Sequence, residues 1–471
     1  MVCTWGMERE GSALSTATGR MNELVELPRA VMRRNIFNMV WPATAESVLQ
    51  MLVGIVATAM VGHISAEAVG AVGLANRVTQ IVWAIFSAIG TGATVLIARS
   101  IGARERDRAK TVAQQALVLA IALVALLAPL VVWQARNLMV GLFSAKGEIL
   151  ALSYSYLSLA AWAMPFLAVM QVCGAILRGA GNTRTPMMVA FIVNIINVCL
   201  SYVFIYGLGP VVGMGVRGAA LSAIIAQSIG AVIALFVLSR PQGEVSFPLF
   251  KGYSPISLEV KRILNIGVPS AFEHVFWQGA TIILMRLIVT FGTAELAAHQ
   301  LGLTAESLSY MPSVGFGIAA TAFVGQSLGA GNARQAQAYV GELARWSMLL
   351  TAFTASLLFF FPRVLMGWLT ADQAVIELGA KYLMLMALVQ LPQQLSGVLN
   401  GAMRGGGDTK APMIIGGTGL WLVRLPLSYL LSLHFGLGIM GVWLAMTFDL
   451  VIRFAMSLFR YFRGPWRTMK L

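Results

Sequence analysis

Charged residues are scarce in this chain of 471 residues: Asp, Glu, Lys and Arg together make up 11%, against about 25% in a soluble domain. Hydrophobic residues make up 58%, more than the roughly 45–50% of soluble domains. The three cysteines are too few and too scattered for a disulfide framework. This composition excludes a soluble globular domain and a disulfide-stapled one, and it predicts an integral membrane protein.

Twelve long apolar segments lie between about residue 36 and residue 460, separated by short polar loops. They run for about 20 residues or more, which is the length of a membrane-crossing helix and about twice that of a barrel strand. Helices also pair every backbone amide internally, as hydrocarbon requires. We therefore predict an all-α integral membrane fold with twelve transmembrane helices.

The formal net charge is +14, which alone would also be compatible with nucleic-acid binding. The basic residues, however, gather in the first tail, the loop after the second segment, the mid-chain segment and the last tail, and the loops between these are poor in basic residues. This alternation follows the positive-inside rule. We expect a multi-pass protein of the plasma (inner) membrane with both termini in the cytoplasm, surrounded by the lipid bilayer and without a nucleic-acid partner.

The chain repeats its own landmarks. The segment RGAGNTRTPM, which begins at Arg178, returns 226 positions later as RGGGDTKAPM, beginning at Arg404. A Pro-x-x-x-Glu element ends at Glu46 and again at Glu273. Six spans per half is an even number, so the halves enter the membrane in the same direction and a pseudo-twofold axis along the membrane normal relates them. We predict two six-helix lobes with function at the seam between them.

This duplication gives the predicted organisation of the chain. It consists of a cytoplasmic N-terminal tail (1–35), a first lobe (36–240), a cytoplasmic linker (241–261), a second lobe (262–462) and a cytoplasmic C-terminal tail (463–471). The linker is rich in proline and glycine, which suits a connection between lobes.

Each Arg-Gly loop is interpreted first as a helix connection. Its glycines end one helix, and Asn182 or Asp408 caps the next one. Arg178 and Arg404 then stand at helix C-termini, where a cation offsets the helix dipole and maintains the positive-inside orientation.

Four acidic residues lie deep inside the predicted helices: Glu46, Glu273, Glu306 and Asp449. An ionisable group near mid-bilayer costs about 2.5–3.5 kcal/mol, so each needs a partner, a water-filled cavity or a proton. Glu46 and Glu273 are either coupling or substrate-binding groups or structural carboxyls bonded to a neighbouring helix. Gln50 and Gln278 are their candidate amide neighbours.

Glu306 and Asp449 share the second half with the intramembrane cations Arg286 and Arg424. Opposite charges inside one bundle usually pair. We interpret these four residues as a charge network of the second lobe, with a structural or a transport role. No His/Glu spacing typical of a metal site and no nucleophile set is present, so we expect no metal, no catalytic residue and no enzyme activity.

Taken together, these landmarks resemble the multidrug and toxic compound extrusion (MATE) family. The match covers about residues 36–460 and rests on the Arg-Gly loops and on the runs VPSAFE (268–273), GTAELAAHQ (292–300) and VGQSLGAGN (324–332). The resemblance implies a secondary-active multidrug or organic cation antiporter whose two lobes rock about a central cleft. Its expected partners are small amphipathic or cationic substrates, with a proton or sodium ion for coupling and no other cofactor, and it is expected to be a monomer.

The sequence departs from the family pattern at three family aspartates. Ala57 stands in place of the first-helix aspartate of many relatives, and Ser201 stands in place of a fifth-helix aspartate four residues after Asn197. Gln393 takes roughly the place of a tenth-helix aspartate. Asn197 and Gln393 therefore join the candidate site, which lacks the usual first-lobe carboxylates.

Glu273 matches a seventh-helix glutamate of many relatives, and Glu46 is its counterpart in the repeat. Carboxylate coupling is therefore expected at these two positions or in the charge network of the second lobe. The run Arg424-Leu425-Pro426 favours the DinF-like branch. The alternative function is a lipid-linked oligosaccharide flippase of the same superfamily.

Overall fold

The structure is a computed structural model that describes residues 28–143, 146–208, 211–240 and 257–469. Within these ranges, twelve helical units are long and apolar enough to cross a membrane. The predicted all-α fold with twelve transmembrane helices is confirmed.

The first lobe contains six of these units, and one of them is composite. In chain order they are α2 (Arg29–Gly62), α3 (Ala66–Gly102), α4 (Arg106–Phe143), the composite α5 (Gly147–Ala160), η1 (Ala161–Ala163) and α6 (Met164–Gly179), then α7 (Arg184–Tyr206) and α8 (Val216–Ser239). Between α7 and α8, the two-residue strands β1 (Gly207–Leu208) and β2 (Val211–Val212) pair antiparallel.

The second lobe repeats this plan, with a broken eleventh span. Its elements are α9 (Ser257–Val289), α10 (Thr293–Gly329), α11 (Ala333–Phe360), α12 (Pro362–Gly367), α13 (Gln373–Gly405), α14 (Lys410–Gly417), η2 (Thr418–Arg424), α15 (Leu425–Tyr429), η3 (Leu430–His434), α16 (Ile439–Arg463) and η4 (Pro465–Arg467). The segments η2 and η3 are π-helical, a conformation that is frequent at functional sites.

The element boundaries differ from the expected ones at both chain ends and at the linker. The first helix begins at Arg29, before the expected start at about residue 36, and α9 already begins at Ser257. After α16, η4 buries Trp466 against the second-lobe core. Residues 1–27 of the expected tail (1–35) and residues 241–256 of the expected linker (241–261) lie outside the described residues, so the proposed domain division stays a prediction.

The first helix of each lobe begins inside the core of the other lobe. Met32, Ile36 and Met39 of α2 belong to a buried apolar cluster built mainly from α10, α11 and α13. Reciprocally, Ile263 and Ile266 of α9 belong to the main apolar cluster of the first lobe. This exchange holds the two lobes together.

The seam between the lobes is reciprocal at the level of single residues. A Cβ added to Gly102 of α3 would lie 1.9 Å from the carbonyl oxygen of Gln326 in α10, and one added to Gly329 of α10 would lie 2.1 Å from the carbonyl oxygen of Arg99 in α3. Only glycine permits such backbone contact. Because each contact is the repeat counterpart of the other, the predicted pseudo-twofold relation between the lobes is confirmed.

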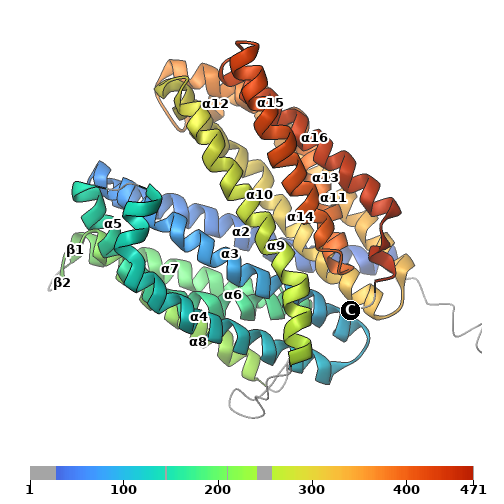
Figure 1. The fold of residues 1–471 in the computed structure, drawn as a ribbon. Helices are drawn as coiled ribbons and strands as arrows, with labels where there is room; N and C mark the ends of the chain where they lie inside the picture. Colours follow the sequence, from blue (N-terminus) through green and yellow to red (C-terminus); the bar gives the residue numbers. More distant parts are fainter. Residues whose placement is uncertain (1–27, 144–145, 209–210, 241–256, 470–471) are drawn as a thin grey trace, which may run out of the picture.

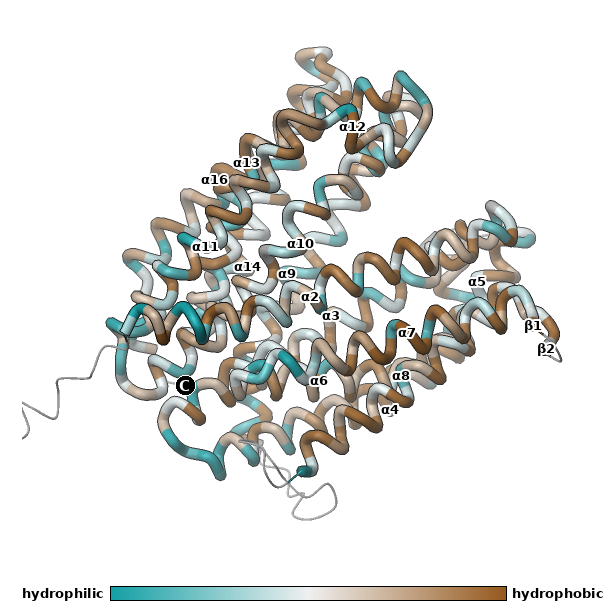
Figure 2. Tube along the Cα trace, turned by 180° about the vertical axis from the view of Figure 1, so that it is seen from behind, coloured by the Kyte–Doolittle hydropathy of each residue, from teal (hydrophilic) through white to brown (hydrophobic). Residues whose placement is uncertain are grey.

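The lobes meet near the end that carries the described C-terminus and diverge toward the end that carries α5, the β1–β2 hairpin and α12 (Figure 1). Apolar residues run along the middle of the outer helices α4, α7 and α8, whereas hydrophilic residues are frequent near the helix ends (Figure 2). This distribution matches a protein surrounded by lipid at mid-height.

Candidate functional site

The repeated landmarks form two equivalent ion pairs. In the first lobe, Arg178 Nη1 lies 3.2 Å from Glu46 Oε1. In the second, Arg404 Nη2 lies 2.6 Å from Glu273 Oε2. The exposed fractions of the two glutamate side chains are 12% and 25%, so both pairs are largely buried. The Pro-x-x-x-Glu element and the Arg-Gly loop of each lobe therefore make a single structural unit.

The Arg-Gly loops also have the predicted capping geometry. Gly181 and Gly407 adopt positive φ angles of 86° and 91°. Asn182 Oδ1 accepts a hydrogen bond from the backbone amide of Thr185 at 3.0 Å, as Asp408 Oδ1 does from that of Ala411 at 3.3 Å. The turn confirms the interpretation as a helix connection.

The partners of Arg178 and Arg404 were missed by sequence reasoning, which assigned these side chains to the helix dipole and to orientation. A recognisable feature was nevertheless present, because both halves carry one buried Glu and one Arg at the same repeat positions. A paired acid and base that recur together point to contact within each lobe.

A cavity of about 210 Å³ adjoins the first of these ion pairs. Glu46, Gln50 and Arg178 line it, together with residues that sequence reasoning missed: Trp83, Gln171, Asn194 and Gln227, and apolar side chains of α6 and α7. Asn194 Nδ2 and Gln227 Oε1 are buried and have no hydrogen-bond partner among the described residues. Unpartnered buried polar atoms are costly, and here they leave a donor and an acceptor free for a ligand.

Asn197 does not line this cavity; it belongs to a neutral cluster on α7 and α8. Ser201 Oγ donates a hydrogen bond to Asn197 Oδ1 at 3.1 Å and lies 2.7 Å from Ser222 Oγ. Ser201, at the position where the resemblance implies an aspartate, thus has neutral hydrogen-bond partners.

Gln278 does not accompany Glu273 as expected. Its Nε2 donates to Gln80 Oε1 of the other lobe at 2.8 Å. Five residues along a helix correspond to a rotation of about 140° from the starting face, so the two side chains point in different directions. Gln393 of α13 retains a buried Oε1 without a partner among the described residues.

The expected four-residue charge network of the second lobe is only partly correct. Asp449 is fully buried, and its Oδ2 lies 2.8 Å from Arg424 Nη2 and 2.9 Å from Arg453 Nη2. Arg286 is exposed and makes no ion pair or hydrogen bond within the described part of the chain. Arg286 therefore does not join the ion cluster of Asp449, Arg424 and Arg453 in the structure.

Glu306 also lies outside the direct contacts of that network. Its carboxylate accepts a hydrogen bond from Tyr382 Oη and another, at 2.9 Å, from Gln390 Nε2. Arg424 lies in the same lobe, but its ion-pair partner is Asp449 and not Glu306. Glu306 is therefore the one of the four intramembrane carboxylates whose direct partners, within the described residues, are all neutral.

Comparison with known proteins gives a consistent result. The MatE family profile matches residues 42–203 and 269–430. A probable multidrug resistance protein NorM from Thermotoga maritima is 33% identical over 440 residues, covering 92% of this chain and 93% of that protein. The multidrug resistance protein MdtK of Yersinia pseudotuberculosis is 25% identical over 408 residues, covering 86% and 88% of the two chains.

Solved structures share the fold at lower sequence identity. A MOP superfamily transporter from Pyrococcus furiosus superposes with a TM-score of 0.87 at 20% identity, covering 93% of this chain and 97% of that one. A variant of the Vibrio cholerae MATE transporter VcmN gives a TM-score of 0.86, also at 20% identity and with the same two coverages.

Proposed function

Because the chain belongs to the MatE family, we propose that it is a secondary-active exporter of small amphipathic or cationic compounds, which it exchanges for protons or sodium ions. Two relatives are named as multidrug resistance proteins, which supports a broad substrate range. Lobes that touch at one end and diverge at the other suit rocker-switch alternating access (Figure 1). Each exported molecule would then cross between the lobes.

The positive-inside rule orients this exchange. Both termini and the α3–α4 and α10–α11 turns, with Arg104, Arg106 and Arg334, belong to the cytoplasmic side of a multi-pass protein in the inner membrane. The diverging end then faces the exterior, so the structure corresponds to an outward-facing state. We expect a monomer to suffice, since one chain supplies both lobes.

The observation that carries the substrate site is the first-lobe cavity. It combines a carboxylate, Glu46, with the free amide groups of Asn194 and Gln227 and the indole of Trp83. A cationic substrate competes with Arg178 for Glu46 and stacks on Trp83 by a cation–π contact. The apolar lining receives the rest of an amphipathic molecule.

The second lobe is the better place for ion coupling. Asp449 and Glu273 already face arginines, whereas Glu306 has only Tyr382 and Gln390 in direct contact. A buried carboxylate needs a counter-charge or a proton. Glu306 is thus suited to take up an external proton or sodium ion, and Glu273 to release Arg404 as the lobes move.

This function is tested with the purified full-length chain in proteoliposomes loaded with a fluorescent organic cation. We expect efflux of the fluorescent cation when a proton or a sodium gradient is imposed. The variant Glu306→Gln should reduce this efflux to the level of empty liposomes. Glu377→Gln is the matched control, since Glu377 forms an exposed ion pair with Arg363 outside the core. Efflux that ignores both gradients contradicts antiport, and normal efflux by Glu306→Gln contradicts the coupling site alone.

The flippase alternative is not supported. A lipid-linked pyrophosphate requires a basic cleft, whereas the first-lobe cavity holds one arginine already paired with a glutamate. The named relatives are multidrug resistance proteins.

A further inference from the structure

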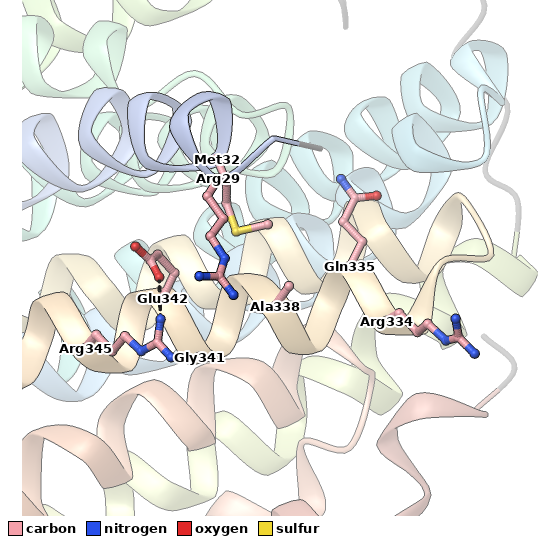
Figure 3. Close-up of a pocket in the computed structure, with 8 residues that line it drawn as sticks. All are labelled: Arg29, Met32, Arg334, Gln335, Ala338, Gly341, Glu342 and Arg345. Carbon is pink, nitrogen blue, oxygen red and sulfur yellow. Dashed lines mark hydrogen bonds and ion pairs between the residues drawn. The ribbon is translucent and has the colours of Figure 1, made fainter. Parts of the chain in front are cut away.

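A second cavity lies far from the first-lobe cavity, at the seam where α2 begins. It has a volume of about 230 Å³ and lies between the first turns of α2 and the first half of α11. Arg29 and Met32 of α2 line one side, and Arg334 and Arg345 of α11 line the other (Figure 3). The cavity therefore joins residues from both repeats.

The floor of this cavity consists of small residues. Ala338 and Gly341 stand about one turn apart on α11. A Cβ added to Gly341 would meet no atom within 4 Å. The cavity therefore exists because Ala338 and Gly341 have no large side chains to fill the space next to the arginines. The positive-inside rule explains basic residues at this height but not a hollow between them.

The cavity carries a clear excess of positive charge. Glu342 is its one acidic lining residue, and it is neutralised by Arg33 of α2 at 2.5 Å and by Arg345 at 3.2 Å. Arg29 and Arg334 have no acidic partner among the described residues. Two guanidinium groups, one on each of the helices that line the cavity, have free hydrogen-bond donors and favour the binding of a phosphate group.

Apolar surface continues from the cavity along both helices into the membrane. On α2, Phe37 and Trp41 are 55% and 60% exposed, one and two turns beyond Arg33. On α11, Leu349 and Phe353 are 73% and 65% exposed, one and two turns beyond Arg345. A molecule with a phosphate headgroup and hydrocarbon chains is complementary to a basic cavity that continues into exposed apolar helix faces.

We propose that this cavity binds the phosphate headgroup of an anionic phospholipid, with the acyl chains lying along the exposed faces of α2 and α11. Basic pockets between helices on the cytoplasmic side are a known form of lipid recognition. Arg29 of α2 and Arg334 at the start of α11 supply the positive charge that attracts the headgroup to the cavity. The site is separate from export, because none of its residues lines the first-lobe cavity.

Native mass spectrometry of the full-length protein tests this site. Titration with phosphatidylglycerol should give a bound lipid that phosphatidylcholine does not replace. Arg29→Gln with Arg334→Gln should weaken this binding by about 30-fold, as expected for two basic residues at about 1 kcal/mol each. Gly341→Leu, which fills the hollow without changing charge, should weaken it as well.

The matched control is Arg104→Gln with Arg106→Gln, which removes two exposed arginines of the α3–α4 turn and should leave lipid binding unchanged. Equal weakening in this control, or unchanged binding in both cavity variants, overturns the proposal in favour of unspecific attraction. Inorganic phosphate is the second arm. Displacement of the lipid by phosphate at the same concentration overturns the assignment to a lipid, because the acyl chains would then contribute nothing.

Discussion

The two lobes place different chemistry at the same point of the repeat, where the fifth span of each lobe packs on the sixth. In the first lobe, α7 and α8 meet through Asn197, Ser201 and Ser222, which are all neutral. In the second, η2 and α16 meet through Arg424, Asp449 and Arg453. The fifth and sixth spans therefore pack in the same way in both lobes, although the polar residues between them differ.

This difference affects local structure and energy. The first-lobe helix α7 is continuous, whereas its counterpart is interrupted by the π-helical segments η2 and η3. A buried ion cluster is costly to desolvate and is retained only with good geometry. The second lobe thus carries buried charge and an irregular helix together, at a position where the first lobe has neither.

The largest expected effect compares these two clusters directly. Asp449→Asn leaves Arg424 and Arg453 without a counter-charge and should lower the free energy of unfolding by about 3–5 kcal/mol. Ser222→Ala removes a neutral hydrogen bond and should lower it by about 1 kcal/mol. Chemical unfolding in detergent, followed by circular dichroism, measures both. Equal losses would mean that the ion cluster is no more critical than its neutral counterpart.

The next largest loss of stability is expected for substitutions at the seam, where equivalent changes in the two lobes should have equal effects. Gly102→Ala and Gly329→Ala each place a Cβ within 2.1 Å of a carbonyl oxygen in the opposite lobe. Each should cost about 1–3 kcal/mol, by analogy with overpacking. Gly341→Ala, at an open position, is the control and should be neutral or stabilising. A clear difference between the two seam variants in thermal unfolding would contradict the symmetry of the contact.

Substitutions in the two Glu–Arg pairs should have similar effects on stability but different effects on transport. Glu46→Gln and Glu273→Gln each remove a charged partner and should cost about 1–3 kcal/mol. We expect Glu46→Gln to raise the KM for a cationic substrate, and Glu273→Gln to slow gradient-driven efflux at saturating substrate. Proteoliposome transport measures both. The same kinetic change in both variants would contradict the assignment of substrate binding to Glu46 and of ion coupling to Glu273.

The smallest effect is expected at the cross-lobe amide pair. Gln278→Ala removes its hydrogen bond to Gln80, which is exposed and worth at most about 1 kcal/mol. Thermal unfolding should barely change, whereas hydrogen exchange in the middle of α3 and α9 should become faster. Unchanged exchange would show that this contact does not join the lobes.

Most of the fold could be predicted from the sequence, because its causes are local or repeated. Apolar length predicts the spans, and the recurrence at Arg178 and Arg404 predicts two lobes. The position of Gln278 could have been predicted too, since helical rotation separates it from Glu273. The boundary at Arg29 could not, because the polar first turns of α2 pack on the other lobe, which makes them helical despite their composition.

The acidic residues of the candidate site could be predicted from the sequence, whereas most of the residues around them could not. Glu46 and Glu273 stand out because hydrocarbon penalises charge. Asn194 and Gln227 do not, because single amides in apolar helices are common and only the tertiary structure shows that their atoms lack partners. Arg286 and Arg424 look equivalent in sequence, yet Arg286 is exposed and makes no ion pair among the described residues, whereas Arg424 contacts Asp449.

The reciprocal seam has the form of an isologous interface, in which the same patch on two copies contacts itself. Gly102 against Gln326 and Arg99 against Gly329 are the two halves of one such contact, and α2 and α9 exchange their first turns as swapped segments of a dimer do. The two lobes of this single chain therefore meet in the same way as the subunits of a symmetric dimer. The recognition between the halves resides in backbone contacts, which tolerate divergence of the surrounding side chains.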